Sequence, residues 1–356
     1  MIPLKLVAAN DTFGALVALG EVLAANQAVF ITAPEVNGKM PETFGLPDEV
    51  DAGVGLIVET SGSSGTPKRV TLSREAILAS ANASQIRLGG PGQWLLALPI
   101  NFVAGANVLI RSLVADTQPV LMNTSVPFTA DAFARSASLM TGSRRYTSLV
   151  PTQLSRLAAA LDDPFSPTGT NDFLLAQLRK FDAILVGGQA PQDEIIAPLK
   201  ALGINIVVTY GMTETGGGCV YDGVPLLGVS VEIAEDSGEI LVSAPQLATE
   251  YVGDDQRTSD TFQNRNGVVW YHTGDAGSLE TGVLTVLGRL DRVITSGGLK
   301  IDLDAVEAVV RGIPGCSQAL VIHIPDSEWG VRPAVVIPGT APSADLQATV
   351  YDEIVT

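Results

Sequence analysis

The chain has 356 residues, of which 46% are hydrophobic and 17% are charged, so it can bury a substantial core and is not expected to be disordered. Its formal net charge of −17 excludes nucleic-acid binding through a general basic face and opposes binding to an anionic membrane. An anionic ligand must therefore be held by local groups such as backbone amides, a few cations or a metal ion.

The chain carries no sign of export or of membrane insertion. Its N-terminal segment lacks the basic start, continuous apolar core and cleavage site of a signal peptide. Its apolar runs are shorter than the roughly 18 to 20 residues that span a bilayer. Cys219 and Cys316 are far apart in the sequence and lack metal-ligand spacing. We therefore expect a cytoplasmic protein with reduced cysteines.

Short β-rich runs alternate with Ala- and Leu-rich segments through the first two-thirds of the chain, which predicts an α/β fold with mainly parallel sheets and helices. The predicted strands include residues 93–99, 183–186 and 205–209. The predicted helices include residues 73–84, 104–114, 130–140 and 152–161.

Between residues 228 and 288 the strands become short and are interrupted by Gly, Asp and Asn, which favours a small antiparallel or barrel-like subdomain. Its predicted strands are residues 229–233, 239–243, 268–272 and 284–287.

The last part of the chain is predicted to be a small α+β domain. Residues 302–310 form its predicted helix, capped by Asp302 or Asp304, and its predicted strands are 318–324 and 332–337. The expected division is an N-terminal domain (1–288), which includes the β-rich subdomain (228–288), then a hinge (289–292) and a C-terminal domain (293–356).

The segment VETSGSSGTPK, residues 58–68, has the composition of a phosphate-binding loop. Glycines let backbone N–H groups approach a polyphosphate, hydroxyl groups add donors, and Lys68 supplies a positive charge. The spacing does not match the P-loop GxxxxGK[ST], because Pro67 precedes Lys68, and it does not match GxGxxG. A flexible surface loop without a ligand is the alternative interpretation.

Five further motifs follow this loop. They are LVGGQAP (185–191), TYGMTET (209–215), WYHTGD (270–275), GRLDRVI (288–294) and SGGLKI (296–301). Together and in this order, from about residue 56 to about residue 310, they resemble the acyl-adenylate-forming (AMP-binding) superfamily. That superfamily comprises acyl-CoA synthetases, peptide-synthetase adenylation domains and luciferases.

The resemblance implies that the chain binds ATP with Mg²⁺ and that CoA is its cosubstrate. The implied phosphate-binding residues are Thr60, Ser61, Gly62, Ser63, Ser64, Gly65, Thr66 and Lys68. The implied adenine-binding residues are Gly187, Gly188, Gln189, Gly211 and Tyr210, which would stack on the purine. Asp275 would accept both ribose hydroxyls, assisted by Arg289.

Three residues would be catalytic by the same resemblance. Lys68 would act on the phosphates, Thr213 would bind the α-phosphate, and Glu214 would hold Mg²⁺ through its carboxylate oxygens. Asp291 matches the hinge at which the small domain rotates between the two half-reactions. The implied CoA tunnel is lined by Gly297, Gly298 and Lys300.

Within the superfamily, LPINFVAG (98–105) and VLIRS (108–112) resemble the o-succinylbenzoate–CoA ligases of menaquinone biosynthesis. GGGCVYDGVPL (216–226) and SGGLK (296–300) resemble the compact actinobacterial form of these enzymes. The implied substrate pocket consists of Asn101, Phe102, Gly105, Gly216, Gly217 and Gly218. Arg111 is considered as a charge for the second carboxylate of such a substrate, but a helical arginine is more often solvated or paired within the structure.

The chain departs from the family at two places. Many relatives have a histidine where Asn101 stands, whereas the histidines here are His272, expected to be a strand residue beside the ribose site, and His323. The family also has a catalytic lysine near its C-terminus, and no lysine follows Lys300. We expect that the natural protein continues to that lysine; the alternative is its loss. The chain as given would then make the adenylate poorly while still binding ATP.

Three alternatives to an o-succinylbenzoate–CoA ligase remain open. The first is a CoA synthetase for another acid, such as a benzoate, a cinnamate or a fatty acid. The second is a peptide-synthetase loading domain, although no carrier-protein segment follows. The third is a nucleotide-binding homologue without turnover. The expected partners are the carboxylic acid, ATP and CoA, with no nucleic acid and no membrane; a homodimer is left open.

Overall fold

The computed structural model describes residues 1–41, 43, 45–60, 68–163, 169–189, 193–316, 319–337, 346 and 349. The chain forms two compact units. Unit 1 comprises Met1–Val231, Val242–Tyr271 and Thr281–Leu284, and unit 2 comprises Glu232–Leu241, His272–Glu280 and Thr285–Thr356. The domain bounds and the hinge expected from the sequence remain predictions.

A six-stranded mixed sheet forms one layer of unit 1. Its strands, in spatial order, are β15 (Glu250–Tyr251), β5 (Lys68–Ser73), β4 (Val54–Thr60), β2 (Ala28–Thr32), β1 (Ile2–Ala8) and β3 (Glu49–Val50). The β1–β2 and β2–β4 pairs are parallel, and the other pairs are antiparallel. The strands of the predicted phosphate-binding loop, β4 and β5, therefore lie next to β15, which comes from much later in the sequence.

A seven-stranded sheet forms the second layer and carries the predicted adenine-binding motifs. Its strands, in order, are β12 (Val224–Pro225), β11 (Gly217–Tyr221), β10 (Ile206–Met212), β9 (Ala183–Val186), β8 (Arg145–Leu149), β6 (Gln93–Leu96) and β7 (Val120–Leu121). From β10 to β7 all pairs are parallel, whereas β10, β11 and β12 are antiparallel. The predicted parallel sheet and its strands are confirmed, with ends that differ by a few residues.

Both faces of this sheet are buried. In β9, Ala183 and Leu185 belong to one hydrophobic core, and Ile184 and Val186 belong to the other. This explains why the strand is apolar at every position, since a parallel strand covered on both faces needs no polar side.

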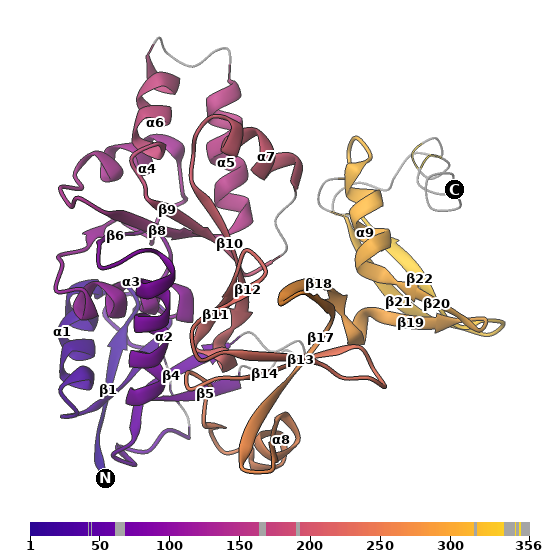
Figure 1. Cartoon of the computed structure of the whole chain (residues 1–356), viewed down its shortest axis with the longest axis horizontal. Helices are drawn as coiled ribbons and strands as arrows, with labels where there is room; N and C mark the ends of the chain where they lie inside the picture. Colours follow the sequence, from indigo (N-terminus) through magenta and orange to yellow (C-terminus); the bar gives the residue numbers. More distant parts are fainter. Residues whose placement is uncertain are drawn as a thin grey trace. The chain divides into compact units, whose positions relative to one another are not determined.

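Two layers of helices cover the sheet, as Figure 1 shows for unit 1. The helices between the two sheets are α1 (Thr12–Leu23), α2 (Arg74–Arg87) and α3 (Val103–Val114). Those on the outer face are α4 (Ala130–Ser138), α5 (Pro151–Asp162), α6 (Thr170–Leu178) and α7 (Asp193–Ala201). The four helices predicted from the sequence are confirmed as α2 to α5. Ser73 caps α2 by accepting the amide of Ala76.

The β-rich region is also confirmed. Its sheet has the order β13 (Ser230–Ile233), β14 (Glu239–Ser243), β17 (Val268–Glu280) and β16 (Phe262–Arg265), with β18 (Val283–Arg289) paired to β17 and α8 (Asp255–Thr261) before β16. The sequence predicted a strand over residues 268–272, in a region where Gly, Asp and Asn interrupt the strands. The strand instead continues through Gly274, whose φ of +70° allows a local turn inside the strand.

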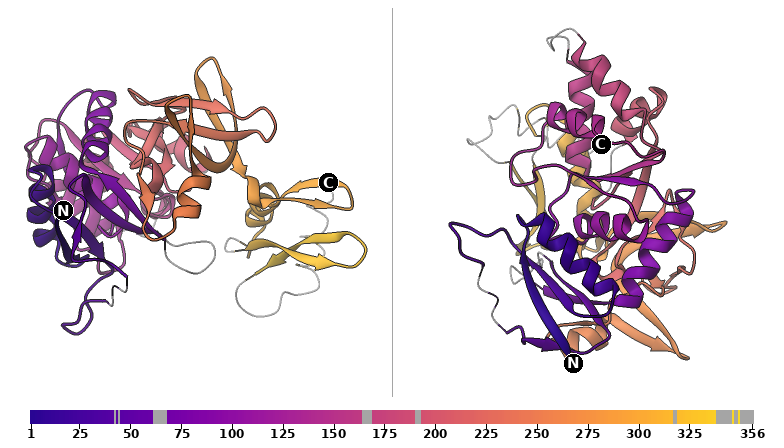
Figure 2. Two further views of the ribbon diagram at one scale, coloured as in Figure 1. Left: turned by 90° about the horizontal axis from the view of Figure 1, so that it is seen from below. Right: turned by 90° about the vertical axis from the view of Figure 1, so that its left-hand side faces the viewer.

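The described residues of the C-terminal part of unit 2 include two antiparallel hairpins and helix α9. The hairpins are β19 (Val293–Ser296) with β20 (Leu299–Asp302), and β21 (Leu320–Asp326) with β22 (Gly330–Val336). Helix α9 (Leu303–Gly312) shares a hydrophobic core with them, and Figure 2 shows this part at the yellow end of the ribbon. Asp302 caps α9 as predicted. Within the described residues, no helix is both long enough and apolar enough to cross a membrane.

Candidate active site

The two ends of the predicted phosphate-binding loop lie side by side. Ser61, Gly62, Ser63, Ser64, Gly65 and Thr66 lie outside the described residues. Thr60 is the last residue of β4 and pairs directly with Lys68, the first residue of β5. The Thr60 hydroxyl also donates to the Lys68 carbonyl oxygen at 3.5 Å. The fold therefore holds one predicted donor and the predicted cation at the same end of a strand pair.

Glu214 is held in a buried turn by a tyrosine. It lies in η1 (Thr213–Thr215), directly after β10, and its side chain is buried. The Tyr251 hydroxyl donates to Glu214 Oε1 at 2.7 Å, and within the described residues only this carboxylate oxygen is engaged. Burial, followed by the nearby charge of Glu214, raises the pKa of Tyr251, so the phenol stays protonated and keeps donating. Among the described residues, none forms a hydrogen bond with Glu214 Oε2.

Strand β15 brings Glu214 next to the phosphate-loop strands. Tyr251 pairs with Val70 in β5, two residues after Lys68. The Ala248 amide, just before β15, donates to the Glu214 carbonyl oxygen at 2.8 Å. Lys68 and Glu214 are thus connected through one strand pairing and one side-chain hydrogen bond, although they are far apart in sequence.

Thr215 fixes the turn that carries Thr213 and Glu214. The Thr215 hydroxyl accepts the Met212 amide at 2.9 Å and donates to the Gly217 carbonyl oxygen at 2.8 Å. The Gly216 amide donates to the Thr213 carbonyl oxygen at 3.0 Å. This bonding fixes the backbone of the turn and leaves the Thr213 side chain partly exposed.

The predicted adenine-binding residues lie at the carboxyl ends of two neighbouring parallel strands. Gly187, Gly188 and Gln189 follow β9, and Tyr210 and Gly211 lie near the end of β10. A Cβ atom at Gly187 would lie 2.3 Å from Thr209 Oγ1, so close packing of β9 on β10 itself requires glycine there. Ligands of parallel sheets bind at this edge.

Helix α3 connects the two parts of the predicted substrate pocket. Asn101 and Phe102 precede α3, Gly105 lies in its first turn, and residue Phe102 is 49% exposed. Further along α3, Asn107 Nδ2 donates to the Gly216 carbonyl oxygen at 2.9 Å. The helix therefore packs directly on the glycine run 216–218, and the pocket itself remains a prediction.

Arg111 is buried within the structure and is not a solvated helix residue. Its residue exposure is 6%, and its guanidinium lies over the Trp94 ring, 5.0 Å from the centroid. Its Nη2 donates to the Tyr221 hydroxyl at 3.2 Å, while Nε has no hydrogen-bond partner within the described residues. A buried guanidinium paired with a neutral hydroxyl makes this interior region electropositive.

The predicted ribose-binding pair lies in unit 2. Asp275 is buried in β17, and Arg289 Nη1 donates to its Oδ1 at 3.3 Å and to the Thr273 carbonyl oxygen at 3.1 Å. The same guanidinium forms two parallel hydrogen bonds with Asp291, each 3.1 Å long. These hydrogen bonds from Arg289 lower the pKa of Asp291. Arg289 therefore joins the predicted ribose carboxylate to the predicted hinge residue.

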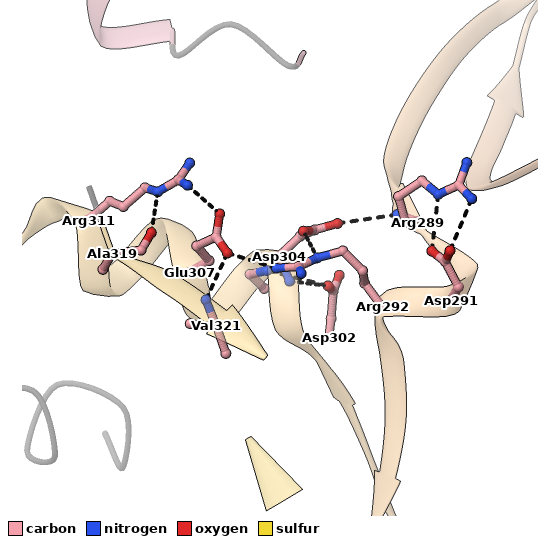
Figure 3. A network of polar contacts seen from close by, with 10 residues as sticks. Arg289, Asp291, Arg292, Asp302, Asp304, Glu307, Arg311, Ala319 and Val321 are labelled. Carbon is pink, nitrogen blue, oxygen red and sulfur yellow. Dashed lines mark hydrogen bonds and ion pairs between the residues drawn. The ribbon is translucent and has the colours of Figure 1, made fainter. Parts of the chain in front are cut away.

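A polar network ties the predicted hinge to α9, as Figure 3 shows. Asp291 and Arg292 lie in η2 (Leu290–Arg292). Arg292 bonds to Asp304 and, at 2.8 Å, to Glu307. Glu307 also accepts the Val321 amide at 2.9 Å, so α9 and β21 are fixed to Arg292 together. The hinge role of Asp291 remains a prediction.

The predicted CoA-tunnel glycines have different surroundings. A Cβ atom at Gly297 would lie 2.1 Å from the Trp329 ring, and the Gly297 amide donates to the Trp329 carbonyl oxygen at 3.1 Å. A Cβ atom at Gly298 would meet nothing within 4 Å. Lys300 is exposed on β20. Of the two glycines, Gly298 thus has open space beside it.

Comparison with known proteins places these motifs in a family. The model that describes the AMP-binding enzyme family matches residues 47–252, which is more than half of the chain. The chain belongs to the AMP-binding enzyme family. The matched range includes the loop strands, the adenine edge and Glu214 with its tyrosine.

Relatives of this AMP-binding enzyme include CoA ligases. The chain is 37% identical over 350 residues to the probable 2-succinylbenzoate–CoA ligase of Mycobacterium tuberculosis, covering 97% of this chain and 87% of that protein. It is 28% identical to the solved structure of E. coli MenE with a bound m-phenylether-linked analogue of OSB-AMS, with a TM-score of 0.62 and coverage of 94% and 73%.

A third relative is similar in structure. The Bacillus subtilis o-succinylbenzoate CoA synthetase, solved in complex with the acyl-adenylate intermediate OSB-AMP, has a TM-score of 0.72, 24% identity, and coverage of 98% of this chain and 76% of that one. At this identity the likeness concerns the fold alone.

Several residues that support the site of this AMP-binding enzyme lie outside the sequence motifs. Tyr251 positions Glu214, Asn107 binds the glycine run, and Glu239 bonds to the predicted ribose turn. No motif marks these residues, because each lies far along the chain from its partner. Within the described residues, no cluster of three His, Cys, Asp or Glu side chains could hold a metal ion by itself, so a cation at Glu214 needs further ligands.

Proposed function

We propose that this protein is an ATP-dependent acid–CoA ligase that converts o-succinylbenzoate into o-succinylbenzoyl-CoA, as in menaquinone biosynthesis. The single observation that supports it best is the joining of Lys68, Thr60 and Glu214 by the β5–β15 pairing and the Tyr251 hydrogen bond. The names of the relatives described above supply the acid.

The chemistry explains why such a site is needed. A carboxylate does not acylate a thiol, because oxide is a very poor leaving group. Attack of the carboxylate oxygen on the α-phosphorus of ATP forms acyl-AMP and releases pyrophosphate. The CoA thiol then attacks the acyl carbon and AMP leaves. The protein must hold two anions together and offset their repulsion, which is electrostatic preorganisation.

The residues of unit 1 divide this work. Lys68 and Thr60 bind the β- and γ-phosphates together with the loop between them, and Thr213 binds the α-phosphate. Glu214 contributes a buried carboxylate with one oxygen fixed by Tyr251, a donor type that Mg²⁺ accepts. Bound there with phosphate oxygens, Mg²⁺ would supply charge neutralisation. Tyr210 stacks on the adenine and Gly187, Gly188 and Gln189 line its edge.

In this proposal the acid binds beside the contact between α3 and the glycine run. Asn101, Phe102 and Gly105 come from the α3 side, and the run at 216–218 faces the helix through Asn107. Arg111 is one helical turn beyond Asn107 and carries a buried charge without a carboxylate partner in the described residues. Its field would favour a substrate with a second carboxylate, which o-succinylbenzoate has.

The proposal gives roles to the predicted ribose, hinge and CoA residues as well. Asp275, with Arg289, binds the ribose hydroxyls, and Asp291 is the pivot between the two half-reactions. Gly298 leaves room for the pantetheine arm of CoA, with Gly297 and Lys300 on the same hairpin.

The proposal predicts a ranking of acids. For this protein, kcat/KM for CoA-dependent AMP release is expected to be at least 10-fold higher with o-succinylbenzoate than with benzoate, cinnamate or a fatty acid. A ranking of o-succinylbenzoate below the simple aryl acids would instead indicate another acyl-CoA synthetase. ATP binding by calorimetry without turnover on any acid would indicate a nucleotide-binding homologue.

The assembly and the location belong to the same proposal. We propose a cytoplasmic homodimer, supported by Cys219 and Cys316, both free and buried, and by two exposed apolar residues one turn apart on α1, Phe13 and Val17. Light scattering after gel filtration is expected to give twice the monomer mass, and Phe13→Ser is expected to shift it toward the monomer. A monomer mass for the unaltered protein would contradict the dimer.

A further inference from the structure

The short turn Thr273-Gly274-Asp275, which carries the predicted ribose carboxylate, is fixed from one side by β14. The Thr273 hydroxyl donates to the Ile240 carbonyl oxygen at 2.8 Å and accepts the Asp275 amide at 3.0 Å. The Gly274 amide donates to Oε1 of Glu239 at 2.8 Å. Two of these contacts involve backbone and hydroxyl groups, and the third depends on a single carboxylate.

Glu239 bonds to both flanks of Thr273. Its Oε1 accepts the Gly274 amide, and its Oε2 lies 2.9 Å from His272 Nδ1, which must donate because a carboxylate oxygen accepts. The Glu239 side chain is only 15% exposed. His272 Nε2 is buried and has no hydrogen-bond partner within the described residues. The contact with Glu239 therefore orients the imidazole.

The turn needs this support because its backbone is not extended. Gly274 has a φ of +70°, so the strand bends locally between His272 and Asp275. A hydrogen bond to a charged acceptor is stronger than one between neutral groups, and an amide that loses a buried acceptor is destabilised. Without Glu239 the turn is expected to relax and to carry Asp275 away from its present position. A displacement of about 1 Å in a binding group can lower the activity of an enzyme by a large factor.

We propose that Glu239 is a positioning residue for ribose recognition, acting through the Gly274 amide and His272 on the orientation of Asp275. The inference rests on the proposed function, in which Asp275 accepts the ribose hydroxyls of ATP. If Glu239 only joined β14 to β17, its loss would lower the stability of the protein and nothing else. If it positions Asp275, its loss lowers the affinity only for nucleotides whose ribose hydroxyls donate hydrogen bonds to Asp275.

The test compares ATP with 2′,3′-dideoxy-ATP, which lacks both hydroxyls, by titration calorimetry. The unaltered protein is expected to bind ATP more tightly than the dideoxy nucleotide. Glu239→Ala is expected to weaken ATP binding about 10-fold and dideoxy-ATP binding less than twofold. Glu239→Gln is expected to stay within about twofold for both, because its amide oxygen can accept the Gly274 amide and its NH₂ can donate to Nδ1 of His272 once the imidazole proton has moved to Nε2. Glu280→Ala, an exposed carboxylate at the end of β17, is the matched control and is expected to change neither.

Each outcome decides between the explanations. Equal weakening of both nucleotides by Glu239→Ala, or no weakening of ATP, would overturn the positioning role. If the alanine variant does not fold, Glu239→Asp keeps the charge but shortens the reach, and the same selective loss is expected for it. Asp275→Ala tests the assignment beneath the proposal. If it leaves ATP binding unchanged and the unaltered protein binds both nucleotides equally, the ribose assignment fails, independently of Glu239.

Discussion

Replacing Glu214 by alanine is expected to lower the rate of ATP-dependent acyl-CoA formation by about 100-fold or more. The carboxylate lies in a buried turn with Oε1 bonded to Tyr251, so its other oxygen is held in one place for a cation. Without this carboxylate the cation would not be held, and the repulsion between the phosphates and the substrate carboxylate would not be offset. Initial rates of pyrophosphate release at saturating acid, measured against ATP and Mg²⁺ concentration, give the effect.

Two further variants separate the position of Glu214 from its charge. Tyr251→Phe keeps the carboxylate but removes the hydrogen bond that fixes it. Hydrogen bonds to charged groups contribute about 1.5 to 3 kcal/mol, so a smaller loss of about 10-fold is expected. Glu250→Ala removes an exposed carboxylate from the same strand and is expected to leave the rate within about twofold. Unchanged turnover in Glu214→Ala would contradict the site assignment, whatever the controls show.

Gly211→Ala is expected to destabilise unit 1 by about 3 kcal/mol or more and to abolish nucleotide binding. Gly211 has a φ of +154°, and a Cβ atom there would lie 2.2 Å from the Gly217 carbonyl oxygen. Since that oxygen belongs to β11, an added methyl group must push β11 away from β10. Native domains have only about 5 to 15 kcal/mol of stability, so urea unfolding would detect the change readily.

A second glycine provides the control for this effect. Gly267 also has a positive φ, +85°, but a Cβ atom there would meet nothing within 4 Å. Gly267→Ala therefore includes the backbone strain without the collision, and about 1 kcal/mol of destabilisation is expected. An equal loss of unfolding free energy in Gly211→Ala and Gly267→Ala would mean that the close approach of β10 and β11 does not add to the destabilisation.

Several strands and motifs lie where the sequence predicted them. The motif TYGMTET predicted a nucleotide site at residues 209–215, and the structure places those residues at the end of a parallel strand. Strand β9 and strand β14 have the predicted ends, because their apolar runs are bounded by turn residues. Strand β17 was predicted too short, because it continues past residue 272 through Gly274, where a positive φ bends the strand without ending it.

Arg111 and Glu239 show what the sequence could not provide. The arginine was expected to be solvated or structurally paired, and only the packing of α3 on Trp94 and Tyr221 shows it to be buried. Nothing in the sequence near Glu239 distinguishes it from the other carboxylates of this acidic chain. Its contact with Gly274 exists because β14 lies beside β17.

The sequence by itself determined the family, the order of the motifs and most helices and strands, because these depend on local patterns of apolar residues, glycines and caps. The tertiary structure decided which side chains support the site: Tyr251 on Glu214, Asn107 on Gly216 and Glu239 on Gly274. Each of these contacts joins segments that are distant along the chain. Such contacts follow from the order of strands in the sheets and the packing of helices on them, which no local pattern encodes.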